Sequence, residues 1–233
     1  MRICWFPDNT VLCNFAAVDR LPLLEKVLDG RGRWTEAVAH EAEQSAQYLP
    51  RLRDIVSVGM LGEPIAITDV EEIAAVDRVR RAVFGGVASA PTKHLGEAET
   101  CVLITRRPEF RDSVWITDDR SAGSYARRRG ITSKETFDLM NEAVVDGLVS
   151  ATDGHDLLGR MVAAGRHTVS RSVLMISYSR PKLIILCSPV AEIPHDDKGL
   201  MGRHSRRWHH DRHRGLNGPF RAALSLRDLE SAC

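Results

Sequence analysis

The chain has 233 residues, of which 43% are hydrophobic and 27% are charged, as in an ordinary globular protein. Lys and Arg total 32 against 31 Asp and Glu, so the formal net charge of +1 gives no sign of a nucleic-acid partner. The average hides an asymmetry, because residues 1–165 hold 20 basic and 25 acidic residues (net −5), whereas residues 166–233 hold 12 basic and 6 acidic (net +6). We therefore expect an acidic domain over 1–165 and a basic Arg/His-rich extension over 166–233.

Composition and spacing exclude several classes of protein. The apolar runs, such as 183–187, are far shorter than the roughly 18 residues of a membrane span. Five scattered Cys without a Cys-x-x-Cys pair favour buried free thiols over a disulfide framework or a zinc site. The chain also reaches Pro7 and Asp8 before a signal-peptide core could form. We expect a cytoplasmic protein with no membrane partner.

The hydrophobic pattern predicts helices that alternate with a few short strands. An apolar strand over 2–6 stops at Pro7, and the strand over 113–117 runs directly into two aspartates. The segment 64–68 fits either a strand or an extended connection. Thr35 is the expected N-cap of the third helix, and Gly147 and Gly165 are expected to end the last two. The predicted helices cover 11–18, 21–28, 35–48, 70–84, 95–105, 121–129, 134–145 and 153–164.

This alternation predicts an α/β protein, a three-layer α/β/α sandwich with a short, mainly parallel central sheet. After residue 165 the pattern deteriorates. Residues 203–214 are mostly Arg and His and cannot bury a face, so we expect the extension to be partly disordered. Apolar runs over 173–178 and 183–187 could still be strands of the same sheet, and 220–229 could form a helix.

Acidic residues gather where the strands are expected to end and helices to begin, which is the edge at which α/β proteins collect functional groups. Several carboxylates at one place repel one another, and a divalent cation is the usual remedy. Oxygen ligands without a soft donor favour Mg²⁺ or Mn²⁺. The candidate metal ligands are Asp8, Glu41, Glu97, Glu99, Asp118 and Asp119.

Each of these acids also has a simpler interpretation. Asp8 could be only a helix N-cap, and Glu41 could be a solvated acid on an amphipathic helix. Two residues apart on a helix, or consecutive at a strand end, side chains point in different directions. We therefore expect one member of each close pair to face the metal and the other to face solvent or an ion-pair partner.

Four motifs in order give the chain a family resemblance. They are Asp8-Asn9-Thr10-Val11-Leu12, Thr35-x-x-Val38-x-x-Glu41, Leu95-Gly96-Glu97-Ala98-Glu99 and Ile116-Thr117-Asp118-Asp119-Arg120. Together they resemble the PIN domain, the metal-dependent nuclease fold of VapC-type toxins. The Gly-Glu-Ala-Glu and Asp-Asp forms are similar to those of a bacterial PIN subgroup described as predicted nucleic-acid-binding proteins. The resemblance covers about residues 1–165.

The resemblance implies a catalytic site of four acids. For the third acid it favours Glu99 over Glu97, and for the fourth it favours Asp119 over Asp118. The implied catalytic residues are Asp8, Glu41, Glu99 and Asp119, with Thr10 and Thr117 as supporting hydroxyls. The implied cofactor is Mg²⁺ or Mn²⁺, and the implied reaction is endonucleolytic hydrolysis of single-stranded RNA, leaving a 5′-phosphate and a 3′-hydroxyl.

The implied partners are single-stranded RNA, a small antitoxin protein if the chain is the toxin of a toxin–antitoxin pair, and a second copy of the chain. Arg120, Arg127 and Arg128 follow the last acid and are candidates for RNA contact, or else form only a solvated helix face. The basic extension is a second candidate for RNA contact.

Three other functions compete with this interpretation. A haloacid-dehalogenase-type phosphatase would have a second Asp two residues after Asp8, where this chain has Thr10. A phosphate-binding loop is excluded because no Gly-x-x-x-x-Gly-Lys-Ser/Thr motif occurs. The remaining alternative is a non-catalytic PIN-like module that binds RNA or protein, which Glu rather than Asp at the third acidic position keeps open.

Overall fold

Three short parallel strands form the centre of the fold in the computed structural model, which describes residues 3–166. They are β1 (Trp5–Pro7), β2 (Val114–Ile116) and β3 (Thr132–Lys134), in the spatial order β1-β2-β3. Trp5 pairs with Val114, which pairs in turn with Thr132. Beyond β1, single bridges from Trp5 to Gly32 and from Thr35 to Ile65 continue the sheet. All these pairings are parallel, so the strands end at one common edge.

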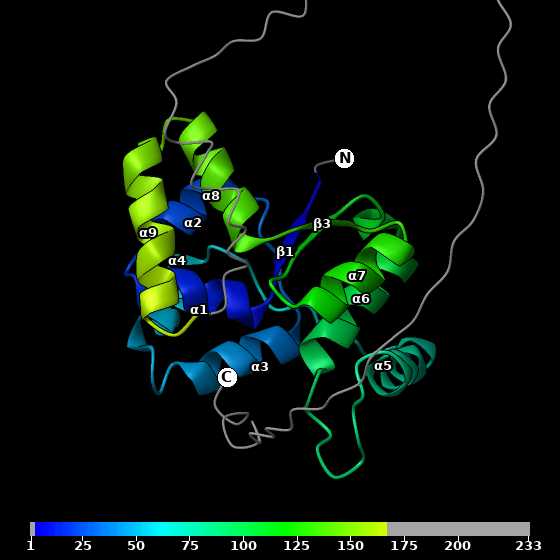
Figure 1. The fold of residues 1–233 in the computed structure, drawn as a ribbon. Helices are drawn as coiled ribbons and strands as arrows, with labels where there is room; N and C mark the ends of the chain where they lie inside the picture. Colours follow the sequence, from blue (N-terminus) through cyan, green and yellow to red (C-terminus); the bar gives the residue numbers. More distant parts are fainter. Residues whose placement is uncertain (1–2, 167–233) are drawn as a thin grey trace, which may run out of the picture. The chain divides into compact units, whose positions relative to one another are not determined.

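Helices cover both faces of this sheet (Figure 1). Their bounds are α1 (Asn9–Ala17), α2 (Leu21–Leu28), α3 (Glu36–Ser45), α4 (Asp54–Val58), α5 (Val70–Ala82), α6 (Leu95–Arg106), α7 (Arg120–Arg128), α8 (Thr136–Val145) and α9 (Ala151–Ala163), with 3-10 turns η1 (Pro50–Arg53) and η2 (Pro108–Phe110). Within residues 3–166, no helix is long and apolar enough to cross a membrane. The expected three-layer α/β/α architecture is confirmed.

Side chains that alternate along the strands divide the core into two parts. Trp5 and Ile116 face the cluster that packs against α1, α2, α8 and α9. Phe6 and Trp115, which are buried completely or nearly so, face the opposite cluster under α6 and α7. Figure 1 shows α1, α2, α8 and α9 on one side of the strands and α5, α6 and α7 on the other. Strands buried on both faces have no polar positions, which explains why β1 and β2 read as short continuous apolar runs.

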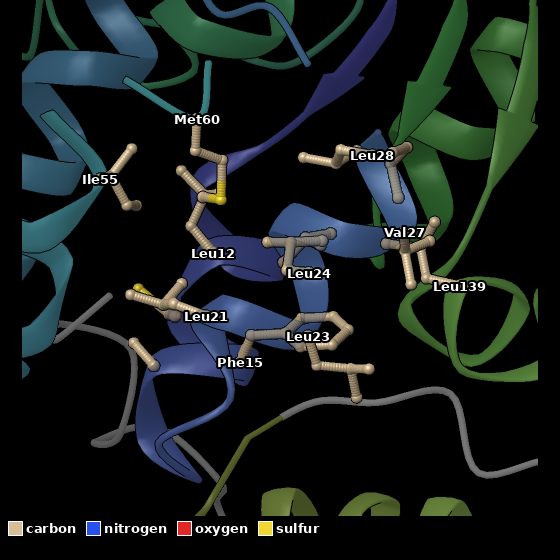
Figure 2. Packing of buried hydrophobic residues seen from close by; sticks show 14 of the residues in the cluster. Leu12, Phe15, Leu21, Leu23, Leu24, Val27, Leu28, Ile55, Met60 and Leu139 are labelled. Atoms are coloured by element: carbon tan, nitrogen blue, oxygen red, sulfur yellow. The ribbon is translucent and has the colours of Figure 1, made fainter. Parts of the chain in front are cut away.

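The larger cluster is centred on the α1–α2 hairpin. Figure 2 shows side chains of α1 and α2 packed together, with Ile55 of α4 and Leu139 of α8 at their border. Leu24 and Leu28 of α2 are completely buried. Burial of apolar surface contributes about 25 cal/mol per Å². Because this cluster is the larger of the two, it is the main source of stability on its side of the sheet.

Most predicted elements lie within a few residues of the observed ones. The segment 64–68 makes only a single bridge, at Ile65, as its alternative as an extended connection allowed. The short helix α4 was not predicted, and neither was β3, whose residues Thr132, Ser133 and Lys134 are polar and only partly covered. The predicted helix over 134–145 starts later, at Thr136, because Lys134 belongs to β3. Patterns noted in 167–233 lie outside the described residues.

The segment between α5 and α6 is held by a buried arginine. Arg80 is 4% exposed, pairs with Asp77, and donates to the carbonyls of Val87 and Ala90 at 3.3 and 3.2 Å. A buried guanidinium is stable only when its donors are satisfied, so these bonds keep the segment folded against α5. The segment ends at His94, directly before α6. Its hydrogen bonds to Arg80 therefore also fix the position at which α6 begins.

We predict that Val27→Ala lowers the free energy of unfolding by about 2 kcal/mol, from lost burial of two methyl groups and the cavity they leave. Val27 is 2% exposed in the α2 core, whereas Val145 at the end of α8 is 84% exposed. The matched change Val145→Ala should be within about 0.5 kcal/mol of neutral. Urea unfolding followed by circular dichroism measures both; equal effects would contradict the described core.

Candidate metal centre

Asp8 stands at the carboxyl end of β1, where the chain enters α1. Its Oδ1 accepts from the Val11 N–H at 2.9 Å as the N-cap of α1, and the Thr117 hydroxyl donates to the same carboxylate. Its own N–H donates to the carbonyl of Ile116 at 2.9 Å, which ties this corner to the end of β2. The side chain is buried, and burial, aided by the charges of Asp118 and Glu97, raises the pKa of Asp8 to about 7.

Glu41 approaches Asp8 from α3. Burial and then the charges of Glu97 and Asp8 raise the pKa of Glu41 to about 8, while the N–H of Gly96 donates to its carboxylate. A Cβ at Gly96 would lie 3.1 and 3.2 Å from the two carboxylate oxygens. A side chain at this buried position would crowd Glu41, and the N–H of Gly96 in the first turn of α6 offsets part of the negative charge of that carboxylate.

Glu97 and Glu99 point to different neighbours, as expected for residues two apart on a helix. Glu97 lies near both Asp8 and Glu41, whose pKa values its charge raises. Glu99 instead accepts from the N–H of Ala37 at 3.1 Å and from the Thr35 hydroxyl, so it caps the start of α3. Burial raises the pKa of Glu99 despite these two bonds. Of the two, Glu97 is the one directed at the acid cluster.

Asp118 and Asp119 also diverge. Asp118 is buried, and its two oxygens accept from the Asn14 amide at 2.7 Å, the Thr136 N–H at 2.9 Å and the Thr136 hydroxyl at 2.5 Å. Burial, together with the charge of Glu135, raises the pKa of Asp118 to about 6. Both oxygens are thus engaged by protein donors.

Asp119 is exposed and is the N-cap of α7. Its Oδ1 accepts from the Ala122 N–H at 2.8 Å and from the Ser121 hydroxyl at 2.5 Å, so both of these bonds use the same oxygen. Burial acts to raise its pKa, but these hydrogen bonds outweigh that effect and hold the pKa of Asp119 below its usual value. Asp119 is therefore ionised over a wide pH range and can still offer one oxygen.

Two polar residues at the site lie outside the predicted motifs and were not predicted from the sequence. Asn14 is completely buried and bridges Asp118 and Thr136. His94 places Nδ1 3.2 Å from Glu97 Oε1, and its backbone adopts the left-handed conformation at φ 61°. The sequence feature that could have singled out Asn14 is its position as a polar residue within the apolar run 11–18. The position of His94 two residues before Gly96 gives no comparable signal.

The remaining predicted residues lie around the cluster. Thr117 is buried and joins two of the acids, because its hydroxyl donates to Asp8 and accepts from the Asp119 N–H at 3.2 Å. Thr10 is exposed in the first turn of α1. The arginines Arg120, Arg127 and Arg128 are all exposed on α7.

The donor set fits a hard divalent cation. Asp8, Glu41 and Glu97 offer carboxylate oxygens, and burial, together with the charges of neighbouring acids, raises the pKa values of Asp8 and Glu41. Mg²⁺ and Mn²⁺ prefer such oxygens and relieve such repulsion. Among residues 3–166, no group of three or more His, Cys, Asp or Glu is already drawn together at metal-binding distance. Asp8, Glu41 and Glu97 are neighbours, and a bound cation would draw their carboxylate oxygens closer together.

Comparison with known families identifies the fold. The family described as the PIN domain matches residues 4–176. The chain belongs to the PIN-domain family. PIN domains typically have a nuclease-type fold, bind nucleic acid and use divalent metals, which agrees with the acids found here. No curated protein and no solved structure matches the chain.

We predict that, without divalent cations, the protein loses stability as pH rises from about 5 to about 8.5. The pKa values of Asp8 and Glu41 are raised in the folded state, so their contribution to stability is present at low pH and is lost as pH passes through about 7 and 8. The loss should be on the order of a few kcal/mol. Thermal unfolding in a chelator measures it.

Two controls belong to this experiment. Asp8→Asn keeps the N-cap but removes one titrating charge, so its melting temperature should fall less steeply with pH. Adding Mn²⁺ should raise the melting temperature of the natural protein more at about pH 8.5 than at about pH 5, because protonation competes with binding. A melting temperature that rises with pH in the chelator would contradict the described burial of these acids.

Proposed function

We propose that the protein is a Mg²⁺- or Mn²⁺-dependent endoribonuclease that hydrolyses phosphodiester bonds of single-stranded RNA. The observation that carries the proposal is the arrangement of Asp8, Glu41 and Glu97, from three separate elements, around the carboxyl end of β1. Membership of the PIN-domain family supports it. A structural role alone would not favour burying several like charges at one place, because each buried charge costs free energy.

In this proposal Asp8, Glu41, Glu97 and Asp119 hold the cation. The geometry favours Glu97 over Glu99 for the third position, since Glu99 is committed to the Ala37 N–H and the Thr35 hydroxyl. For the fourth position it favours Asp119, which keeps Oδ2 available, over Asp118, whose two oxygens are both engaged.

A divalent cation bound there supplies Lewis-acid chemistry, which activates water for attack on phosphorus and offsets charge on the leaving 3′ oxygen. The chain's own residues prepare the site. Thr117 holds Asp8 and the backbone of Asp119 in fixed relation, and Asn14 with Thr136 holds Asp118 beside them. His94 fixes Glu97 through Nδ1. Such supporting bonds orient ligand oxygens and typically change metal affinity or activity 10–100-fold when removed.

The wider biological role remains a prediction from the family resemblance. The contacts within residues 3–166 do not bear on a toxin activity, an antitoxin partner or a homodimer. RNA contact by Arg120, Arg127 and Arg128 is supported by their exposure on α7, the helix that Asp119 caps. A non-catalytic RNA-binding role is separated from the nuclease by the two experiments that follow.

We predict that Asp8→Asn abolishes metal-dependent cleavage, with a loss of more than about a hundredfold, without unfolding the protein. Asn retains the oxygen that caps α1 but lacks the charge that would hold the cation. Cleavage of a mixed pool of single-stranded RNAs in Mg²⁺ or Mn²⁺, followed by gel electrophoresis, measures the loss. Circular dichroism confirms folding. Full activity in the folded variant would refute the nuclease proposal.

We predict that Glu97→Gln costs far more activity than Glu99→Gln. Glu97 faces Asp8 and Glu41, whereas Glu99 caps α3, so the first change should lower cleavage more than about a hundredfold. The second keeps a side-chain oxygen that can accept from the Ala37 N–H, so cleavage and melting temperature should both change little. Cleavage rates and melting temperatures of both variants provide the test. The opposite ranking would assign the third position to Glu99, as the sequence resemblance favoured.

A further inference from the structure

A small cavity of about 120 Å³ lies between α7, β3 and the start of α8. Its wall includes Thr117, whose hydroxyl also donates to the carboxylate of Asp8. A group bound in the cavity therefore lies directly beside the acid cluster. Pockets that take a whole drug-sized molecule measure roughly 300–1,000 Å³. This cavity is smaller, and it suits one flat ring rather than an entire nucleotide.

One side of the cavity is rich in hydrogen-bond acceptors. The carboxylates of Glu135 and Asp138 line it, together with the hydroxyl of Ser133, and all three residues are partly buried. Asp138 uses Oδ2 to accept from the Glu135 N–H at 2.8 Å, which leaves Oδ1 for a ligand. Phe137 adds a partly buried aromatic ring. This combination selects a flat group that carries N–H donors.

The cavity wall also supplies a cation. Arg127 of α7 lines the cavity, and its Nη2 donates to the Ser124 hydroxyl at 3.3 Å. The guanidinium lies along α7 past Gly123, where a Cβ would be 3.6 Å from Nη1. A ligand in the cavity would thus meet both carboxylates and a guanidinium.

We propose that this cavity binds the guanine base of a nucleotide next to the scissile phosphate, an inference that rests on the proposed function. Guanine presents a ring N–H beside an exocyclic amino group, and one carboxylate can accept from both. Its ring carbonyl, on the same edge, can accept from Arg127. Adenine and cytosine place a ring acceptor beside their amino group, and uracil has a single N–H between two carbonyls. Carboxylates repel those acceptors, so the wall discriminates against the other three bases.

Binding measured in the Asp8→Asn background tests the cavity separately from catalysis. The probes are fluorescein-labelled short oligouridines that carry one central guanosine, inosine or adenosine, titrated with protein and followed by anisotropy. We expect guanosine to bind at least about tenfold more tightly than adenosine, with inosine between them because it lacks the exocyclic amino group. Asp138→Asn and Arg127→Gln should each remove most of this preference.

Matched controls carry the same chemical changes away from the cavity. Asp146→Asn alters an exposed acid at the other end of α8, and Arg128→Gln alters the arginine adjacent to Arg127. Both should keep the guanosine preference, even where Arg128→Gln weakens binding to every probe equally by losing a phosphate contact. Melting temperatures confirm that the variants fold, and Arg127→Gln, an exposed change, keeps the test valid should Asp138→Asn unfold.

The results separate the two proposals. Equal affinity for guanosine and adenosine probes, or a preference that survives in both cavity variants, overturns the guanine site. Metal-dependent cleavage by the natural protein with no base preference at the cut also overturns the guanine site while leaving the nuclease intact. Selective guanosine binding without any cleavage overturns the nuclease and supports the cavity as a site of RNA recognition.

Discussion

Electrostatic repulsion among carboxylates at the carboxyl end of β1 is the constraint around which this domain is organised. Asp8, Glu41 and Glu97 reach the same place from β1, α3 and α6, and burial, together with their mutual repulsion, raises the pKa values of Asp8 and Glu41. Such a cluster costs stability in the absence of a cation. The large apolar cluster around α1 and α2 provides the folding free energy that makes this cost tolerable.

The chain limits the repulsion by placing acids at helix N-termini. Asp8 caps α1, Asp119 caps α7, and Glu99 caps α3, each accepting a backbone N–H from the first turn. Glu41 receives the N–H of Gly96 in the first turn of α6. These amides carry the positive end of the helix dipole, so four helices direct partial positive charge toward the same edge of the sheet.

The two sides of the site differ in chemistry. Between α3 and α6 the residues are acidic and partly buried, which suits a cation. Between α7 and α8 the cavity combines Arg127 with Asp138 and Phe137, which suits an uncharged ring. Thr117 belongs to both sides, since it lines the cavity and donates to Asp8. A single buried threonine at the end of β2 thus links the proposed places of chemistry and of base recognition, and a shift of this strand end would alter both.

Local patterns in the sequence were sufficient to predict most of the helices, their caps and the class of residues at the candidate site. Thr35 and Asp8 read as N-caps, and Gly147 and Gly165 read as C-terminal stops, because each depends on hydrogen bonds and backbone angles within a few residues. The acids before and after the helices indicated a metal site for the same reason: oxygen donors at strand ends are recognisable without knowing their partners. The alternation of helices with short apolar strands was sufficient to predict the three layers.

Only the tertiary structure gave the two acids of each pair different partners. Glu97 and Glu99 are equivalent by spacing, and they become distinct because the start of α3, far away in sequence, offers the N–H of Ala37 to Glu99 and not to Glu97. Asp118 is engaged by Asn14 and Thr136, and neither residue is near it in the chain. The strand β3 was missed for a related reason, since its polar residues gain their place from pairing with β2 rather than from their own hydrophobicity. Contacts between distant segments depend on how the layers pack, and no local pattern records that packing.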